Sequence, residues 1–174
     1  MEFLRVDNTD IEKLSDRQLT ELLSMLLYFE AEKWGISANS VGVALNITVP
    51  DGGEDGRIKW AGEIDKTNWL PKRFTLFQCK ATDMPPSKCK DEILTSTREL
   101  KPMVKEVIEE EGAYILFHNQ TLNEQQQQMR IDQFRKAIDE STLQVDSVSV
   151  CIHIYDAGKI AAWANESISA VVAV

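Results

Sequence analysis

Apolar residues recur at helical spacing between residues 16 and 34, and this pattern predicts an amphipathic helix. The apolar positions are Leu19, Leu22, Leu23, Leu26, Leu27 and Phe29. Ser15 stands where an N-cap is expected, and Gln18 three residues later completes a capping box. Gly35 is suited to end the helix because glycine tolerates the left-handed backbone of that position.

Shorter apolar runs predict strands. They occupy residues 41–49, 57–60, 74–80, 113–118 and 145–155. Helical patterns cover residues 87–111, 123–140 and 158–169, and Pro102 should kink or divide the first of these. The order helix, three strands, helix, strand, helix, strand, helix indicates an α/β domain whose mixed sheet is flanked by helices.

A chain of 174 residues fits one domain with one core. No apolar run approaches the roughly 20 residues that span a bilayer, and no signal-peptide pattern is present. The three cysteines (Cys79, Cys89 and Cys151) lack the spacing of a metal site, and Cys79 and Cys151 fit core positions in strands. We therefore expect a reduced, cytoplasmic protein.

The residues that could bind a metal or take part in catalysis lie at the end of the strand predicted at 74–80. Leu76, Gln78 and Lys80 share one face because side chains alternate along a strand, so that face turns polar at its end. Asp55 precedes the short strand 57–60 and follows a glycine-rich turn. If the two strands pair, Asp55 approaches Gln78 and Lys80. One carboxylate and one amide oxygen can hold Mg²⁺ when water and a substrate phosphate complete its shell.

Simpler interpretations of the same residues stay open. Asp-Gly is first of all turn chemistry, a lysine at a strand end is commonly solvated, and a glutamine on a strand is commonly an edge residue. Asp51 in the same turn is an alternative to Asp55 as the ligand. Thr82 and Ser87 are close enough in sequence to contact a phosphate, but the pattern does not favour either.

The arrangement of Asp55, Gln78 and Lys80 resembles the PD-(D/E)xK nuclease superfamily, in the QxK variant of Mrr-like restriction endonucleases. The resemblance covers residues 14–120. It implies a restriction-endonuclease-like core of the order α-β-β-β-α-β, supplied by residues 16–118, with an extra C-terminal helix-strand-helix. It also implies Asp55 and Gln78 as ligands of Mg²⁺, with Mn²⁺ as a substitute. Lys80 would position water or stabilise the transition state. Gln78 stands where the family usually has an acidic residue.

Glu30 is a further candidate ligand. It continues the apolar stripe at i+11 from Leu19, where a carboxylate is costly unless it is paired or bound to a cation. In the resembling nucleases a glutamate of the first helix often completes the metal site. The alternative is that the stripe ends first and Glu30 meets water. Glu32 and Glu21 are expected to be exposed.

The net charge of −9 argues against nucleic-acid binding by the whole surface. Residues 57–101 carry a net +4, which leaves −13 for the rest, so the basic excess coincides in sequence with the candidate site. A solvated face of mixed charge is the alternative. The two histidines, His118 and His153, are expected to be structural, with a supporting polar role open for His118.

The sequence as a whole resembles the N-terminal nuclease domains of bacterial anti-phage proteins. That resemblance rests on the first helix, the Asp55 and Gln78/Lys80 pair, and a closing segment with Tyr155 and Trp163. It implies cleavage of double-stranded DNA, and a homo-oligomer formed through a sensor or NTPase region outside this chain. The apolar end, residues 170–174, also suggests one module of a larger protein. The alternatives are an inactive nuclease-like domain for nucleic-acid binding or oligomerisation, and an RNase on the same fold.

Overall fold

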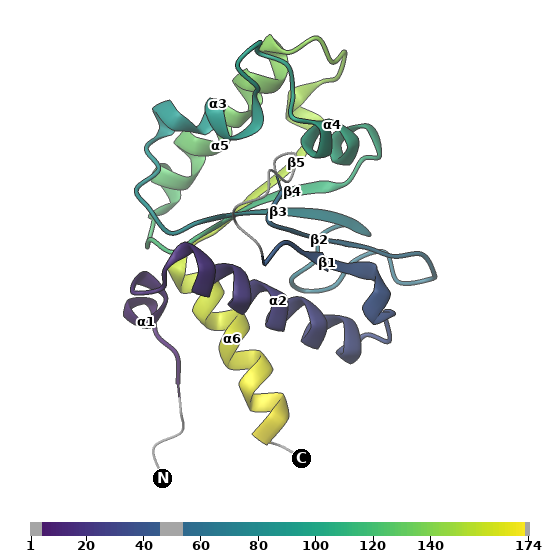
Figure 1. The fold of residues 1–174 in the computed structure, drawn as a ribbon, viewed down its shortest axis with the longest axis vertical. Coiled ribbons are helices and arrows are strands. Elements are labelled where there is room, and N and C mark those ends of the chain that lie inside the picture. The colour runs from purple at the N-terminus through teal and green to yellow at the C-terminus, as the bar shows by residue number, and fades with distance from the viewer. Residues whose placement is uncertain (1–4, 46–53, 173–174) are drawn as a thin grey trace.

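The structure, a computed structural model, describes residues 5–45 and 54–172. Its described part contains a five-stranded sheet in the order β1-β2-β3-β4-β5 (Figure 1). The strands are β1 (Val41–Val43), β2 (Gly56–Lys59), β3 (Phe74–Lys80), β4 (Ala113–His118) and β5 (Cys151–Tyr155). The pairs β1–β2 and β2–β3 are antiparallel, whereas β3–β4 and β4–β5 are parallel. The expected α/β class with a mixed sheet is confirmed.

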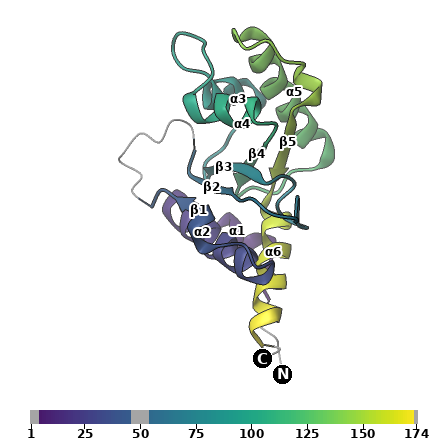
Figure 2. The same cartoon turned by 90° about the vertical axis from the view of Figure 1, so that its right-hand side faces the viewer.

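Helices cover both faces of this sheet (Figures 1 and 2). One layer consists of α1 (Asn8–Glu12), α2 (Asp16–Lys33) and α6 (Ala157–Val172). The other consists of α3 (Pro86–Ile93), α4 (Pro102–Glu109) and α5 (Glu124–Glu140). Phe77 and Cys79 point into the core on the α2–α6 side, whereas Leu76 points into the core on the α3–α5 side. By alternation, Gln78 and Lys80 face the α3–α5 layer.

The first long helix forms as the sequence predicts. The Ser15 hydroxyl accepts from the Gln18 N–H at 3.2 Å, and the Gln18 side chain accepts from the Ser15 N–H at 3.0 Å. Both bonds of the capping box are therefore present and satisfy N–H groups that the first helical turn leaves open. Gly35 has a φ of +68°, the left-handed conformation that glycine adopts without strain.

The prediction of one helical stretch over residues 87–111 is wrong in its middle. Pro102 does divide it, as expected, and begins α4. Residues 94–101, however, form a loop closed by a bridge between Leu94 and Leu100, and Arg98 has a φ of 61°. A non-glycine residue in that conformation cannot lie within an α-helix.

Two strand predictions are too long. The strand predicted at 145–155 is confined to Cys151–Tyr155, because Asp146 caps a 3₁₀ turn over Ser147–Ser149 and accepts from the Val148 N–H at 3.1 Å. The strand predicted at 41–49 begins at Val41, directly after a 3₁₀ turn over Ala38–Ser40, and already ends at Val43. Residues 46–49 of that prediction, like Asp51, lie outside the described residues.

The ends of the chain are more helical than the pattern indicated. The sequence predicted neither α1 nor the full extent of α6, which begins at Ala157 and ends at Val172. The helix α5 agrees with its prediction, and Asn123 is its N-cap. Within the described residues, no helix combines the length and the apolar character that a membrane crossing requires.

Candidate functional site

Asp55 and Gln78 are direct neighbours across two strands. Gln78 Nε2 donates to Asp55 Oδ2 at 2.8 Å, and the Cys79 backbone N–H donates to the same oxygen at 2.7 Å. The backbone of Asp55 is itself held in the sheet, because its N–H donates to the carbonyl of Phe77 at 2.9 Å and its carbonyl accepts from Ala44 at 2.9 Å. The carboxylate is therefore fixed at the point where the β2–β3 ladder ends.

Gly56 explains why the sheet can end in this way beneath α2. A Cβ atom at this position would lie 2.9 Å from Leu23 Cδ2 and 3.4 Å from Val43 Cγ2. Only glycine lets α2 pack this closely on the strand that follows Asp55. Gly56 thus has a structural role in the packing of α2. The Asp55 carboxylate has one as well, because it accepts a hydrogen bond from the backbone N–H of Cys79.

Lys80 lies on the same face as Gln78 and forms an ion pair with Glu92 of α3. Lys80 Nζ and Glu92 Oε1 are 2.8 Å apart, and the two side chains are 27% and 17% exposed. The sequence analysis did not single out Glu92. The segment around it, from Lys88 to Glu92, contains two basic and two acidic residues, a composition that is usual for a solvated helix face.

Two buried oxygen atoms close to this cluster have no hydrogen-bond partner among the described residues. They are the amide oxygen of Gln78 and the hydroxyl of Tyr114. Tyr114 lies on β4 in register with Leu76 and is 2% exposed. Burial raises the pKa of Tyr114 well above its ordinary value, and the charges of Glu92 and Asp55 act in the same direction. The hydroxyl is therefore a protonated donor that lies near both carboxylates.

Buried polar atoms normally have hydrogen-bond partners. Two buried oxygen atoms without such a partner therefore mark a place where a ligand could bind. The donor set around them consists of oxygen atoms, which suits a hard divalent cation more than zinc. No group of three or more histidine, cysteine, aspartate or glutamate side chains forms a metal centre within the described residues. Asp55 and Gln78 are the residues of this cluster that could hold a divalent cation, with water and phosphate completing its shell.

The structure does not bring Glu30 together with this cluster. Glu30 is 1% exposed, so the interpretation that it meets water is wrong. It accepts from Trp34 Nε1 at 2.9 Å on α2, the helix that packs against the opposite face of the sheet from Gln78 and Lys80. An indole N–H, rather than a cation, offsets the cost of its burial.

The remaining candidates lie apart from the cluster. Glu21, Glu32, Thr82 and Ser87 are exposed. His153 is half-buried in β5, and burial lowers its pKa. His118 is fully buried in register with Lys80, and its Nδ1 lies 2.9 Å from the Lys80 carbonyl. Burial also lowers the pKa of His118, so the ring supports the end of β3 in its neutral form.

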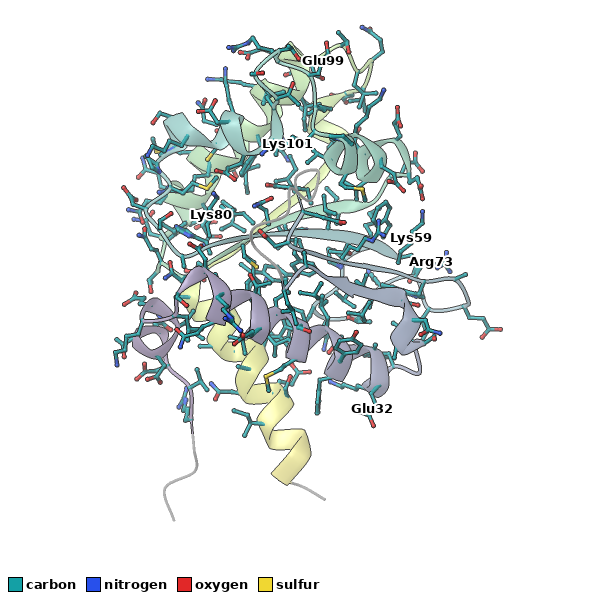
Figure 3. All side chains as sticks on the ribbon, in the orientation of Figure 1. Glu32, Lys59, Arg73, Lys80, Glu99 and Lys101 are labelled. Carbon is teal, nitrogen blue, oxygen red and sulfur yellow. The ribbon has the colours of Figure 1, made fainter. Side chains whose placement is uncertain are left out.

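The basic excess of residues 57–101 is not gathered at the cluster. Lys59 and Arg73 lie at the other end of the sheet from Lys80 (Figure 3). Lys59 pairs with Glu110 at 2.6 Å, and Arg73 donates to the carbonyls of Gly62 and Ile64. Lys90 and Arg98 both pair with Glu140. The charge count along the sequence therefore gives no focused phosphate-binding surface.

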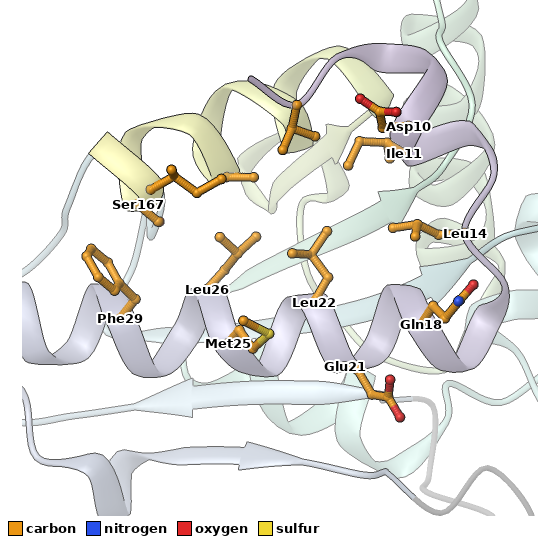
Figure 4. A pocket seen from close by; sticks show the side chains of 13 residues that line it. Asp10, Ile11, Leu14, Gln18, Glu21, Leu22, Met25, Leu26, Phe29 and Ser167 are labelled. Atoms are coloured by element: carbon orange, nitrogen blue, oxygen red, sulfur yellow. The ribbon is translucent and has the colours of Figure 1, made fainter. Parts of the chain in front are cut away.

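A concave region elsewhere in the described structure is an apolar groove of about 570 Å³ between α1, α2 and α6 (Figure 4). Leu22, Leu26 and Phe29 line it from α2, and Met25 at its edge is 70% exposed. Its polar lining residues are Asp10, Gln18, Glu21 and Ser167. The groove lies on the opposite side of the sheet from Gln78 and Lys80. It is suited to apolar packing and holds no group of catalytic side chains.

Comparisons of the chain with protein-family models, with characterised proteins and with solved structures find no match.

Proposed function

We propose that this protein is a divalent-metal-dependent endonuclease that hydrolyses phosphodiester bonds of double-stranded DNA. The observation that carries the proposal is the contact between Asp55 and Gln78, beside a buried amide oxygen of Gln78 that has no partner among the described residues. Lys80 follows on the same face. A carboxylate, a carbonyl oxygen and an ammonium group thus meet at one strand end.

The fold supports the same proposal. The order α2, β1, β2, β3, α3 and α4, then β4, corresponds to the α-β-β-β-α-β core of the PD-(D/E)xK nucleases that the sequence resembles. Asp55 lies immediately before β2, and Gln78 and Lys80 lie on β3, so the candidate residues fall within this order of elements.

Each side chain has a proposed role. Asp55 and Gln78 offer oxygen ligands to Mg²⁺ or Mn²⁺, and we leave Glu30 out of the ligand set because Trp34 holds it on the opposite face. A divalent cation bound there would polarise the phosphodiester and supply a water of lowered pKa. Lys80 positions that water or stabilises the charge that develops on the phosphate. The half-buried setting of Lys80 strengthens such an interaction because water screens it less.

The biological setting that we propose is that of an anti-phage effector, activated when an attached sensor or NTPase region clusters several copies. This proposed setting rests on the resemblance of the sequence to the N-terminal nuclease domains of anti-phage proteins. An inactive nuclease-like domain is the second candidate, and one observation favours it. Asp55 and Lys80 already have partners within the protein, namely Gln78, the Cys79 N–H and Glu92.

Plasmid cleavage with Mg²⁺ or Mn²⁺ at high protein concentration tests the proposal. The variants are wild type, Lys80→Ala and the matched control Lys59→Ala, which removes an ion-paired lysine from the other end of the same ladder. We expect cleavage by wild type and Lys59→Ala, and a loss of about 10²–10³-fold for Lys80→Ala. Equal cleavage by all three would contradict the assigned site. No cleavage by wild type would favour the inactive domain.

An RNA of matched length, assayed beside the plasmid, decides the substrate. Cleavage of RNA alone, lost in Lys80→Ala, would keep the site and replace the proposed DNA substrate.

A further inference from the structure

A single carboxylate makes the proposed metal site weak. The affinity of an oxygen-ligand site for a divalent cation depends on the number of charged ligands, and Gln78 contributes an amide without charge. Glu30 lies on the other face of the sheet, and Glu54 Oε1 lies 4.0 Å from Arg57 Nη1. A second carboxylate supplied by another element would strengthen the site.

Glu92 is in the right place to provide it. Its Oε1 lies 2.8 Å from Lys80 Nζ, and its side chain is 17% exposed. Its charge acts on the Tyr114 hydroxyl, as does the charge of Asp55. Tyr114 is 2% exposed, and its hydroxyl is a buried donor without a partner among the described residues.

The helix α3 presents Glu92 inward for a reason visible in its sequence. Cys89 and Ile93 are buried in the core beneath the helix, at 0% and 1% exposure. Glu92 lies three residues after Cys89, at the edge of this buried face, and four residues after the exposed Lys88. Its side chain is accordingly only partly exposed, whereas Asp91 is exposed. A carboxylate on an inward helix face is costly unless a cation compensates it.

We propose that Glu92 is the second carboxylate ligand of the divalent cation, supplied by α3 in place of the acidic residue that Gln78 replaces on β3. This inference rests on the proposed function. Lys80 pairs with Glu92 and holds its carboxylate beside β3. If a bound cation took the Glu92 carboxylate, the ammonium group of Lys80 would be free to contact a phosphate oxygen.

Calorimetric titration of Mn²⁺ into the protein, without nucleic acid, tests this directly. We expect Glu92→Gln to weaken Mn²⁺ binding by about tenfold or more, because even residues that only support metal ligands cost about 10–100-fold when removed. Asp55→Asn should weaken it at least as much. The matched control Glu109→Gln neutralises an exposed carboxylate on α4 and should leave the affinity unchanged.

A transplanted carboxylate sharpens the test. The double variant Gln78→Glu/Glu92→Gln moves the second carboxylate from α3 to β3, and we expect it to regain the affinity that Glu92→Gln loses. Lys80→Ala should bind Mn²⁺ as tightly as wild type or more tightly, since the competing ammonium group is gone. Thermal unfolding of each variant shows that the fold is retained.

The outcomes separate this inference from the proposed function. If Asp55→Asn loses Mn²⁺ binding and Glu92→Gln retains it, Glu92 is only the partner of Lys80, and the inference is overturned while the proposed function stands. If wild type binds no Mn²⁺ at millimolar concentration, the inference is overturned, and a lack of plasmid cleavage as well would overturn the proposed function.

Discussion

The two ends of the β2–β3 ladder both carry charged side chains, but they satisfy them differently. At one end Lys59 pairs with Glu110 at 2.6 Å and lies 4.7 Å from the ring centre of Phe74. Just beyond the other end, Lys80 pairs with Glu92 at 2.8 Å, and the buried amide oxygen of Gln78 has no partner among the described residues. We call these the basic end and the site end.

The difference shows that charge density is a poor guide to a site. The basic end lines a polar cavity of about 670 Å³, and the sequence concentrates lysine and arginine there. Two of its cations are nevertheless paired, Lys59 with carboxylates and Arg73 with carbonyls, and exposed pairs of this kind contribute little. The site end has fewer charges, but its groups are half-buried and incompletely satisfied, and this is the state in which a ligand gains most.

The comparison predicts that the site end is sensitive to charge. Asp55→Asn keeps an oxygen that can accept from Gln78 Nε2 and the Cys79 N–H, but it removes the negative charge. We expect metal-dependent cleavage to fall by about 100-fold or more, with little change in stability. Plasmid cleavage and thermal unfolding measure the two quantities.

Asp55→Ala separates the structural role of the residue from its charge. It removes the acceptor of the Cys79 N–H, so we expect a further loss of about 1–3 kcal/mol of stability. Glu110→Gln makes the same change of charge at the basic end and should leave cleavage intact. Equal cleavage by Asp55→Asn and wild type would show that Asp55 is not a ligand. Asp51 would then be the candidate ligand.

Much of the fold was accessible from the sequence because its signals are local. The alternation in residues 74–80 and the capping box at Ser15 and Gln18 each specify one element, and the structure has both. The failures have physical causes. The five residues of α1 are too few to show a period, and short helices depend on packing. The segment before Cys151 is apolar enough for a strand, but the Asp146 cap bends it into a 3₁₀ turn.

The site was only partly accessible for the same reason. Asp55, Gln78 and Lys80 lie on adjacent strands, and strand pairing follows from the order of the elements. Glu92 reaches Lys80 through a tertiary contact between α3 and the end of β3, and such a contact has no local signal in the sequence. The prediction that Glu30 belongs to the site failed for a different reason. Its burial was predictable from the helical stripe, but the face of the sheet on which α2 packs was not.

The comparison also predicts that the basic end is sensitive to size. A Cβ atom on Gly112 would lie 2.4 Å from the Phe74 carbonyl oxygen and 2.6 Å from Val107 Cγ2. Backbone cannot yield as a flexible side chain does, so we expect Gly112→Ala to cost about 1–3 kcal/mol or more. For a chain of this length, the melting temperature should fall by about 2–4 °C for each kcal/mol.

Gly158→Ala is the matched control for this substitution. Its nearest contact would be Asn8 at 3.5 Å, and the residue lies in the first turn of α6. Alanine is favoured over glycine in a helix, so we expect no loss and a gain of up to about 1 kcal/mol. Folded Gly112→Ala should retain metal-dependent cleavage. A melting temperature equal to that of wild type would show that Phe74 and Val107 can move apart.

The smallest effect that we expect is a pH dependence located at the site end. Burial lowers the pKa of His118 in the folded protein below the ordinary value of 6.5. Above pH 6.5 both the folded and unfolded states hold neutral histidine, and the contribution of His118 to stability is complete. As the pH falls below 6.5, the unfolded state takes up the proton first, so this contribution is lost as the pH passes through the folded pKa.

Denaturant unfolding at intervals between pH 7 and pH 5 measures this effect. We expect wild type to lose stability over that range and His118→Asn to lose less, whatever its absolute stability. His153→Asn is the natural comparison, because burial also lowers the pKa of His153 but that ring is only half-buried. Its slope should lie closer to that of wild type. Identical slopes for wild type and His118→Asn would mean that His118 gains a proton in the folded state as easily as in the unfolded chain. The bond between His118 Nδ1 and the Lys80 carbonyl, which favours the protonated ring, would then outweigh the burial of His118 at the end of β3.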